Sequence, residues 1–209
     1  TLTQEPAELR AMMRSGELSG LTSGMAPGYV QANLVVLPRA QAFDFLLFCQ
    51  RNPKPCPLLE VVEAGSVEPK QMAPGVDLRT DLPRYRVFEN GELVEEPTSI
   101  SHVWRDDLVS FLLGCSFTFE SALINGGIRI PHFEEGKNTA MFVTSIETTP
   151  AGIFSGPMVV SMRAIPRNKL VRAIQITSRF PSVHGSPVHI GDPAAIGVTD
   201  IPTPDLGDP

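Results

Sequence analysis

Several side chains that could move protons or hold carboxylates are concentrated in residues 129–142, RIPHFEEGKNTAMF. Charged residues beside a glycine are typical of an exposed turn, and this accounts for Glu134 and Glu135 at least as well as a catalytic role does. The other polar members lie closer to the apolar flanks, where a side chain tends to be held in place; they are Arg129, His132, Asn138 and Thr139. Acyl transfer and elimination need such groups: a carboxylate-binding arginine, a histidine that titrates near neutral pH and a fixed amide. We therefore expect the stretch to bind a substrate and to supply a base, either His132 or one of the glutamates.

A second group lies in residues 114–121, GCSFTFES. Cys115 and Ser116 precede an expected helix, where free N–H groups and the helix dipole favour a thiolate or a bound carboxylate. We expect Ser116 to bind substrate, and Cys115 to act as a nucleophile or, the interpretation we favour, to line the pocket. Glu120 is either a surface acid favoured by the dipole or a general base.

Three further residues could bind the substrate, through its carboxylate or through other polar groups. Gln31 and Asn33 point to the same face of the strand expected over residues 28–38, because side chains alternate along a strand. Arg179 follows an apolar element, and its guanidinium matches a carboxylate in a bidentate manner. The four histidines show no metal-ligand spacing, and no dinucleotide or phosphate-loop motif is present, so we predict neither metal nor cofactor.

Composition narrows the class of protein. The chain has 209 residues and 42% hydrophobic content, enough for one compact domain over residues 1–209 or two closely packed lobes. A net charge of -6 argues against nucleic acid as a partner, and the apolar runs are too short to span a membrane. Without a secretory signal, and with three cysteines predicted to be reduced, the chain is expected to be cytoplasmic. A homo-oligomer is compatible with the sequence.

Twenty prolines and 17 glycines predict a mixed α+β fold of irregular β-sheets and several short helices. In the first half we expect helices over residues 6–15, beginning near Thr3 or Gln4, and over residues 39–50. Strands are expected over residues 28–38 and 58–65. Asn90 and Gly91 predict a β-hairpin over residues 85–96, because this dipeptide readily adopts positive φ.

In the second half, Asp106 and Asp107 predict a capped helix over residues 108–115, and Thr118 predicts a second helix over residues 119–126. The expected strands cover residues 128–130, 140–148 and 157–165. Pro166 is expected to open a helix over residues 167–180.

The order and spacing of seven segments resemble the hydro-lyase family that includes D-glutamate cyclase. The segments are GYVQANLVVLP, CPLLEV, DLRTDLPRYRV, FLLGCSFTFESAL, IRIPHFEEGKNTAMFVTSIET, GPMVVSMRAIP and SRFPSVHGSPVHIGDPAAIGV, which together extend over residues 5–205. The resemblance implies a cytoplasmic lyase that eliminates water from a small amino or hydroxy acid, such as one that cyclises D-glutamate to 5-oxo-D-proline. It also implies that the family domain continues beyond Pro209.

Cyclisation would require arginines to hold the α-carboxylate of the substrate and a base to remove the proton of the amine. Asn138, Thr139 or amides near Ser116 would stabilise the tetrahedral oxyanion. Two alternatives remain: β-elimination of water from a hydroxy acid, and a non-catalytic module that binds a small carboxylate or has a regulatory role.

Overall fold

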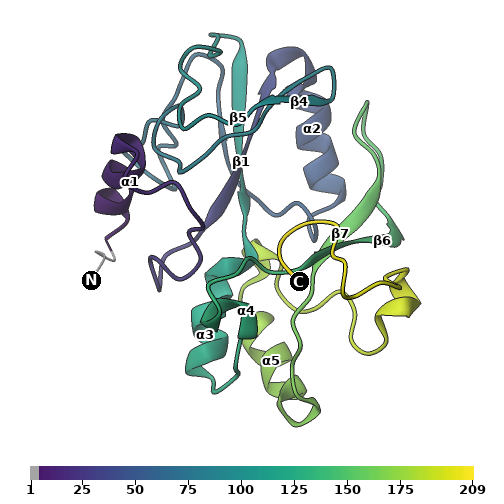
Figure 1. Ribbon diagram of the computed structural model, residues 1–209. Coiled ribbons are helices and arrows are strands. Elements are labelled where there is room, and N and C mark those ends of the chain that lie inside the picture. The colour runs from purple at the N-terminus through teal and green to yellow at the C-terminus, as the bar shows by residue number, and fades with distance from the viewer. Residues whose placement is uncertain (1–4) are drawn as a thin grey trace.

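A three-stranded antiparallel sheet forms the upper half of the molecule (Figure 1). The structure is a computed structural model, and it describes residues 5–209. Strand β5 (Leu108–Gly114) lies between β1 (Ala32–Pro38) and β2 (Leu58–Val62) and pairs with both. All but one of the residues of β5 are buried, as expected for a central strand covered on both faces.

The alternation of side chains along β5 divides the core of the upper half in two. Val109 and Phe111 pack against helix α2 (Arg39–Arg51) through Phe45 and Cys49. Leu112 points to the opposite face, in a separate cluster that consists of Val62, Val76, Leu78 and Leu112. This two-residue period fixes which face each side chain covers.

The helix predicted over residues 108–115 is therefore wrong. Asp106 and Asp107 precede a strand, whose nearly continuous apolar run carries no periodicity that separates it from a buried helix. The second predicted helix exists as the 3₁₀ turn η1 (Ser116–Phe119) followed by α3 (Glu120–Asn125). Thr118 does not cap it, because its hydroxyl accepts a hydrogen bond from the amide of Gln31 at 2.9 Å.

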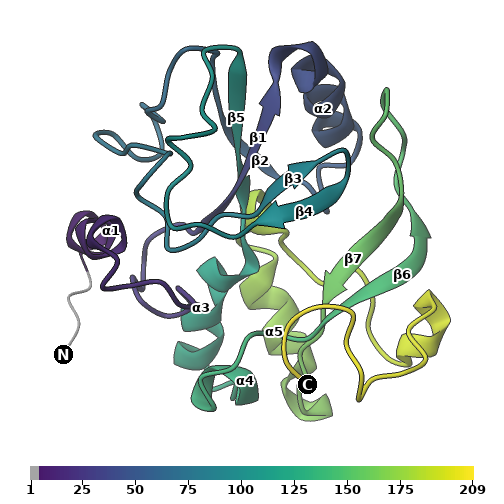
Figure 2. The same ribbon diagram turned by 45° about the horizontal axis from the view of Figure 1, so that its top comes forward.

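Local signals predicted other elements correctly. Helix α1 (Pro6–Ser15) ends at Gly16, which has a φ of 81°, as a left-handed C-terminal residue should. The predicted start of this helix at Thr3 or Gln4 lies outside the described residues. Strands β3 (Val87–Glu89) and β4 (Glu92–Glu95) form the expected hairpin, and both turn residues, Asn90 and Gly91, have positive φ. The hairpin is clearest in Figure 2.

The lower half combines a second hairpin with short helices. Strand β6 (Met141–Glu147) pairs with β7 (Pro157–Ser161), while residues 128–130, predicted as a strand, form none. Helices α3, α4 (Pro131–Glu134) and α5 (Leu170–Thr177) lie together below the sheet (Figure 1). Their core consists of Phe119, Leu123, Ile128, Ile130, Ala173 and Val183.

Short 3₁₀ turns complete the chain, at η2 (Arg167–Lys169), η3 (Pro181–Val183) and η4 (Pro193–Ile196). Near the C-terminus Leu206 forms an antiparallel bridge with Met141, so the last segment lies against β6. Helices and small antiparallel sheets occur together throughout, and the predicted α+β class is confirmed. Within residues 5–209, every helix is too short or too polar to cross a bilayer.

Candidate functional site

A buried carboxylate organises the polar interior of the lower half. The side chain of Glu120 is only 1% exposed. Its Oε1 accepts hydrogen bonds from Arg163, at 2.6 Å from Nη2 and 3.2 Å from Nε, and lies 2.9 Å from Nε2 of His132. Its Oε2 accepts a hydrogen bond of 3.0 Å from the hydroxyl of Ser23. These partners offset the cost of burying the charge, which would be several kcal/mol for an isolated carboxylate.

The members of this Glu120 cluster (Ser23, Ser116, Glu120, His132 and Arg163) come from separate elements. Glu120 opens α3, where the helix dipole favours a carboxylate, and His132 lies in α4. Arg163 follows β7, and its guanidinium lies 5.2 Å from the centre of the Phe119 ring, so an aromatic face and a carboxylate hold it together.

Arg163 also orients the hydroxyl of Ser116. Its Nη2 donates a hydrogen bond of 3.1 Å to Oγ of Ser116. A guanidinium has no acceptor, so the Ser116 oxygen must accept, and the hydroxyl proton remains available to a third group. Ser116 also lines a cavity, so its hydrogen bond connects the cluster to that cavity.

This polar cavity has a volume of about 410 Å³, within the range of small-molecule sites. Its polar lining residues are Thr22, Asn33, Cys115, Ser116, Asn138, Thr139, Ser161 and His184. Five of these were predicted from the sequence, although they come from three distant parts of the chain. In Asn138 the side-chain oxygen accepts the Thr139 amide at 2.9 Å, which leaves the NH₂ group as the free donor.

His184 lines the polar cavity and has an environment that favours its neutral form. Burial lowers the pKa of His184, and the positive charges of Lys54 and Arg163 lower it further. Hydrogen bonds with the backbone carbonyls of Lys54 and Gly114 raise this pKa, but they do not outweigh the lowering. Nδ1 lies 3.0 Å from the Lys54 carbonyl and must donate to it, which leaves Nε2 to accept a proton.

Cys115 lies directly before η1, as expected, but its environment does not favour a thiolate. Burial raises the pKa of Cys115. A hydrogen bond with the backbone of Phe117, the charge of Arg163 and a hydrogen bond with Asn33 offset this only in part. The thiol form therefore dominates at neutral pH, which agrees with a pocket-lining role.

Several predicted residues lie elsewhere. The Arg129 side chain is 75% exposed and pairs with Glu134 at 2.6 Å, while Glu135 pairs with Lys137 at 3.1 Å. Arg179 is exposed, and the side chain of Gln31 accepts a hydrogen bond from Thr22. None of these predicted residues lines the polar cavity.

Sequence reasoning did not select Arg163 or His184. The available signal for Arg163 was its position beside an apolar run, which resembles the signal that favoured Arg129 and Arg179. Its buried partner Glu120 is 43 positions away in the sequence. As for metals, no three His, Cys, Asp or Glu side chains gather closely enough to hold an ion within the described residues.

The fold and the site define an α+β protein with a polar small-molecule cavity beside a buried Glu–Arg–His cluster. The family model for D-glutamate cyclase matches residues 109–209, which include all of β5 except Leu108 and every member of the Glu120 cluster except Ser23. The chain belongs to the hydro-lyase family that includes D-glutamate cyclase, as the order of its segments indicated.

Curated relatives with the name "Putative hydro-lyase" match nearly the whole chain. Teth514_1597 of Thermoanaerobacter sp. (strain X514) is 61% identical over 205 residues, which are 98% of this chain and 77% of the relative. GK2103 of Geobacillus kaustophilus is 62% identical over 97% of this chain and 77% of its own length. YcsI of Bacillus subtilis is 57% identical over 97% of this chain and 79% of its own length.

Proposed function

We propose that the protein is a lyase that removes water from a small carboxylate, and that its reaction is the cyclisation of D-glutamate to 5-oxo-D-proline. Membership of the family supports the class of reaction. The observation that carries the proposal is Ser116, which lines the polar cavity while its hydroxyl oxygen accepts a hydrogen bond from the buried Arg163.

In this reaction the neutral α-amine attacks the carbon of the γ-carboxyl group. A C–N bond forms, a C–O bond breaks, and the departing oxygen leaves as water with one proton from the amine and one from solvent or the enzyme. The amine and the carboxyl group already belong to one molecule, so the enzyme contributes by holding the flexible chain in the cyclic shape in which the two reacting atoms are close and aligned.

The polar cavity supplies donors for the two charged ends of the substrate. The amide groups of Asn33 and Asn138 bind the α-carboxylate, and the Ser116 hydroxyl donates to the oxyanion that develops on the γ-carboxyl group. Because Arg163 donates a hydrogen bond to the oxygen of this hydroxyl, the hydroxyl becomes a stronger donor to the oxyanion.

Proton transfer belongs to His184 in this proposal. Its neutral Nε2 removes the proton of the amine and returns it to the departing oxygen. His132 was one of the candidate bases in the sequence. It lies against Glu120, and we propose it as a positioning residue that holds the carboxylate of the cluster. Arg129 and Arg179 have no part in the proposed reaction.

The test is incubation with D-glutamate and, separately, L-glutamate, with mass spectrometry to detect the loss of one water. Ser116→Ala should lower kcat by about 10²–10³-fold, as the removal of one oxyanion donor does. The exposed Ser178→Ala serves as the matched control and should retain the wild-type rate.

Two results would contradict the proposal. Tight D-glutamate binding without water loss would favour the non-catalytic module. Incubation with hydroxy acids in heavy water tests β-elimination, because only elimination and its reverse exchange a carbon-bound proton. Turnover of a hydroxy acid with such exchange, and none of D-glutamate, would retain the lyase class and remove the cyclisation.

A further inference from the structure

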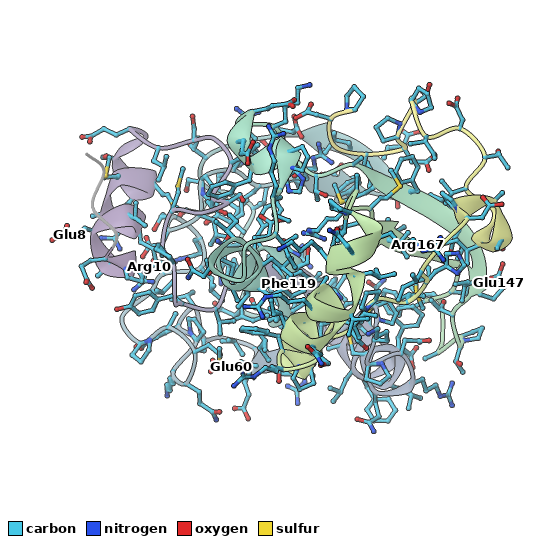
Figure 3. All side chains as sticks on the ribbon, turned by 90° about the horizontal axis from the view of Figure 1, so that it is seen from below. Glu8, Arg10, Glu60, Phe119, Glu147 and Arg167 are labelled. Atoms are coloured by element: carbon cyan, nitrogen blue, oxygen red, sulfur yellow. The ribbon has the colours of Figure 1, made fainter. Side chains whose placement is uncertain are left out.

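A second cavity, of about 730 Å³, lies beside the polar cavity. The two share a wall, which consists of Ser116, Val159, Val160, Ser161 and His184. Its other walls come from β7, from α5 and from the loops over residues 184–198. Figure 3 shows two of its lining residues, Phe119 near the centre of the molecule and Arg167 beside the start of α5. We call this space the apolar cavity.

Most of its lining is hydrocarbon. The large apolar side chains include Phe119, Phe142, Met158, Ile165, Leu170 and Ile196. The polar cavity, in contrast, is little more than half this size and is lined by eight polar side chains. A small polar amino acid fits the chemistry of the polar cavity. It offers no hydrocarbon surface to cover the apolar walls of the second cavity.

The charged groups that line the apolar cavity all have one sign. Lys54, Arg163 and Arg167 line it together with two histidines, and no aspartate or glutamate does so among residues 5–209. Arg163 is neutralised by Glu120, whereas neither Lys54 nor Arg167 forms an ion pair with a carboxylate of the described chain. The cavity therefore has a net positive charge.

Of the two cavity cations without an ion pair in the described chain, Lys54 is held by a hydrogen bond to another wall of the cavity. Its ammonium donates a hydrogen bond to the Ser186 carbonyl, a neutral acceptor from another wall of the cavity. Burial lowers the pKa of Lys54, as expected where water has been removed without a compensating anion. A ligand carboxylate would supply the missing charge, and a charge-assisted hydrogen bond with it would be stronger than one between neutral groups.

We propose that the apolar cavity binds a medium-chain aliphatic monocarboxylate, with its carboxylate at Lys54 and its hydrocarbon chain against the apolar walls. This ligand site is separate from the polar cavity and does not depend on any catalytic activity. The proposal therefore stands or fails by direct binding, whatever the outcome of the D-glutamate experiment.

Isothermal titration calorimetry with hexanoate, octanoate and decanoate, below their micelle concentrations, tests the proposal. Each added methylene should tighten binding by about fourfold, because burial of a methylene contributes about 0.8 kcal/mol. Decylammonium, with the same tail and the opposite charge, should bind at least about tenfold more weakly than decanoate. Absence of decanoate binding, no dependence on chain length, or equal binding of the two decyl ions would overturn the proposal.

Two substitutions locate the site. Lys54→Met keeps the aliphatic stem and removes the charge, and it should weaken decanoate binding by about tenfold to a hundredfold. Lys70→Met removes an exposed lysine that lines neither cavity, and it should leave the affinity unchanged. Ile190→Glu places an acid at an apolar lining position that is 44% exposed, where the fold should tolerate it, and should also weaken binding. Wild-type affinity in both Lys54→Met and Ile190→Glu would assign the carboxylate to some other surface.

Discussion

Glu120 and Arg163 illustrate how much a single buried ion pair can determine. Each side chain is at most 10% exposed, and each has the other as its nearest opposite charge. A buried charge that loses its partner costs far more than the intact pair contributes, because the remaining ion has neither water nor a counter-ion. The cluster should therefore be sensitive to truncation on either side.

Glu120→Ala should lower the free energy of unfolding by about 3–5 kcal/mol, because it leaves the Arg163 guanidinium buried and unpaired. Glu120→Gln, which keeps the shape and one acceptor oxygen, should cost less. Glu134→Ala is the matched control, since it removes the partner of the exposed Arg129 and should cost less than about 1 kcal/mol. Urea denaturation measures all three, and equal losses for the two alanine variants would contradict the assigned role of Glu120.

Some residues of the polar cavity could be chosen from the sequence because their side chains are hydrogen-bond donors in any fold. Asn138, Thr139 and Ser116 were recognisable as donors beside apolar segments, and they do line the cavity. Arg129 and Arg163 look alike in sequence, since each borders an apolar run. Only the tertiary position of Glu120 distinguishes them, and no local pattern specifies which arginine meets a carboxylate 43 positions away.

At the scale of elements, the sequence predicted correctly those helices and strands whose ends are marked by nearby residues. Helix α1 and the β3–β4 hairpin end or turn at glycine and asparagine residues whose positive φ is a local property. Strand β5 was mistaken for a helix because its burial on both faces removes the alternation that identifies a strand. Its pairing partners, β1 and β2, are about 50 to 80 residues away in the sequence, so their effect is invisible to a short window.

The position of helix α1 provides a prediction about pH. Arg14, at the end of α1, makes two hydrogen bonds to the buried carboxylate of Asp81, at 2.6 and 2.5 Å. Burial by itself raises the pKa of Asp81, but hydrogen bonds from Arg14, Thr80 and the Asp77 amide together hold this pKa below its ordinary value of 3.8. A depressed folded-state pKa adds stability above the ordinary value, and this contribution is lost as the pH falls toward the folded-state pKa.

The free energy of unfolding of the wild type should therefore exceed that of Asp81→Asn at pH 6, and the difference should shrink below about pH 4. Urea denaturation over this pH range measures it. Glu96→Gln, which removes an exposed pair with Arg86, is the control and should show little difference from the wild type at any pH. A difference between wild type and Asp81→Asn that stays constant down to pH 3 would contradict the coupling.

The whole molecule contains separate core clusters above and below the site, and the connections between them determine whether it unfolds as one unit. Strand β5 continues directly through Cys115 into η1, so the two halves share a continuous backbone at the cavity. The buried Asn52, which follows α2, exchanges two hydrogen bonds of 2.8 Å with the backbone of Thr149. His184 makes a hydrogen bond with the Lys54 carbonyl, 130 positions away in the sequence. The sequence left open one compact domain or two closely packed lobes, and on the basis of these long-range contacts we propose the first.

We accordingly expect cooperative unfolding, which two single-tryptophan proteins can test. The only tryptophan, Trp104, precedes β5 and reports on the upper half. The double variant Trp104→Phe/Phe180→Trp moves the fluorophore to the edge of the lower core, where Phe180 packs against Phe119 with ring centres 6.3 Å apart. In each protein the fluorescence and far-UV circular dichroism midpoints in urea should coincide, because two-state unfolding gives the same transition for every probe. If the fluorescence of the double variant changes at a lower urea concentration than its dichroism signal, the halves are separately stable lobes. A ligand in the apolar cavity should then bring the two transitions together, because it stabilises the lower half.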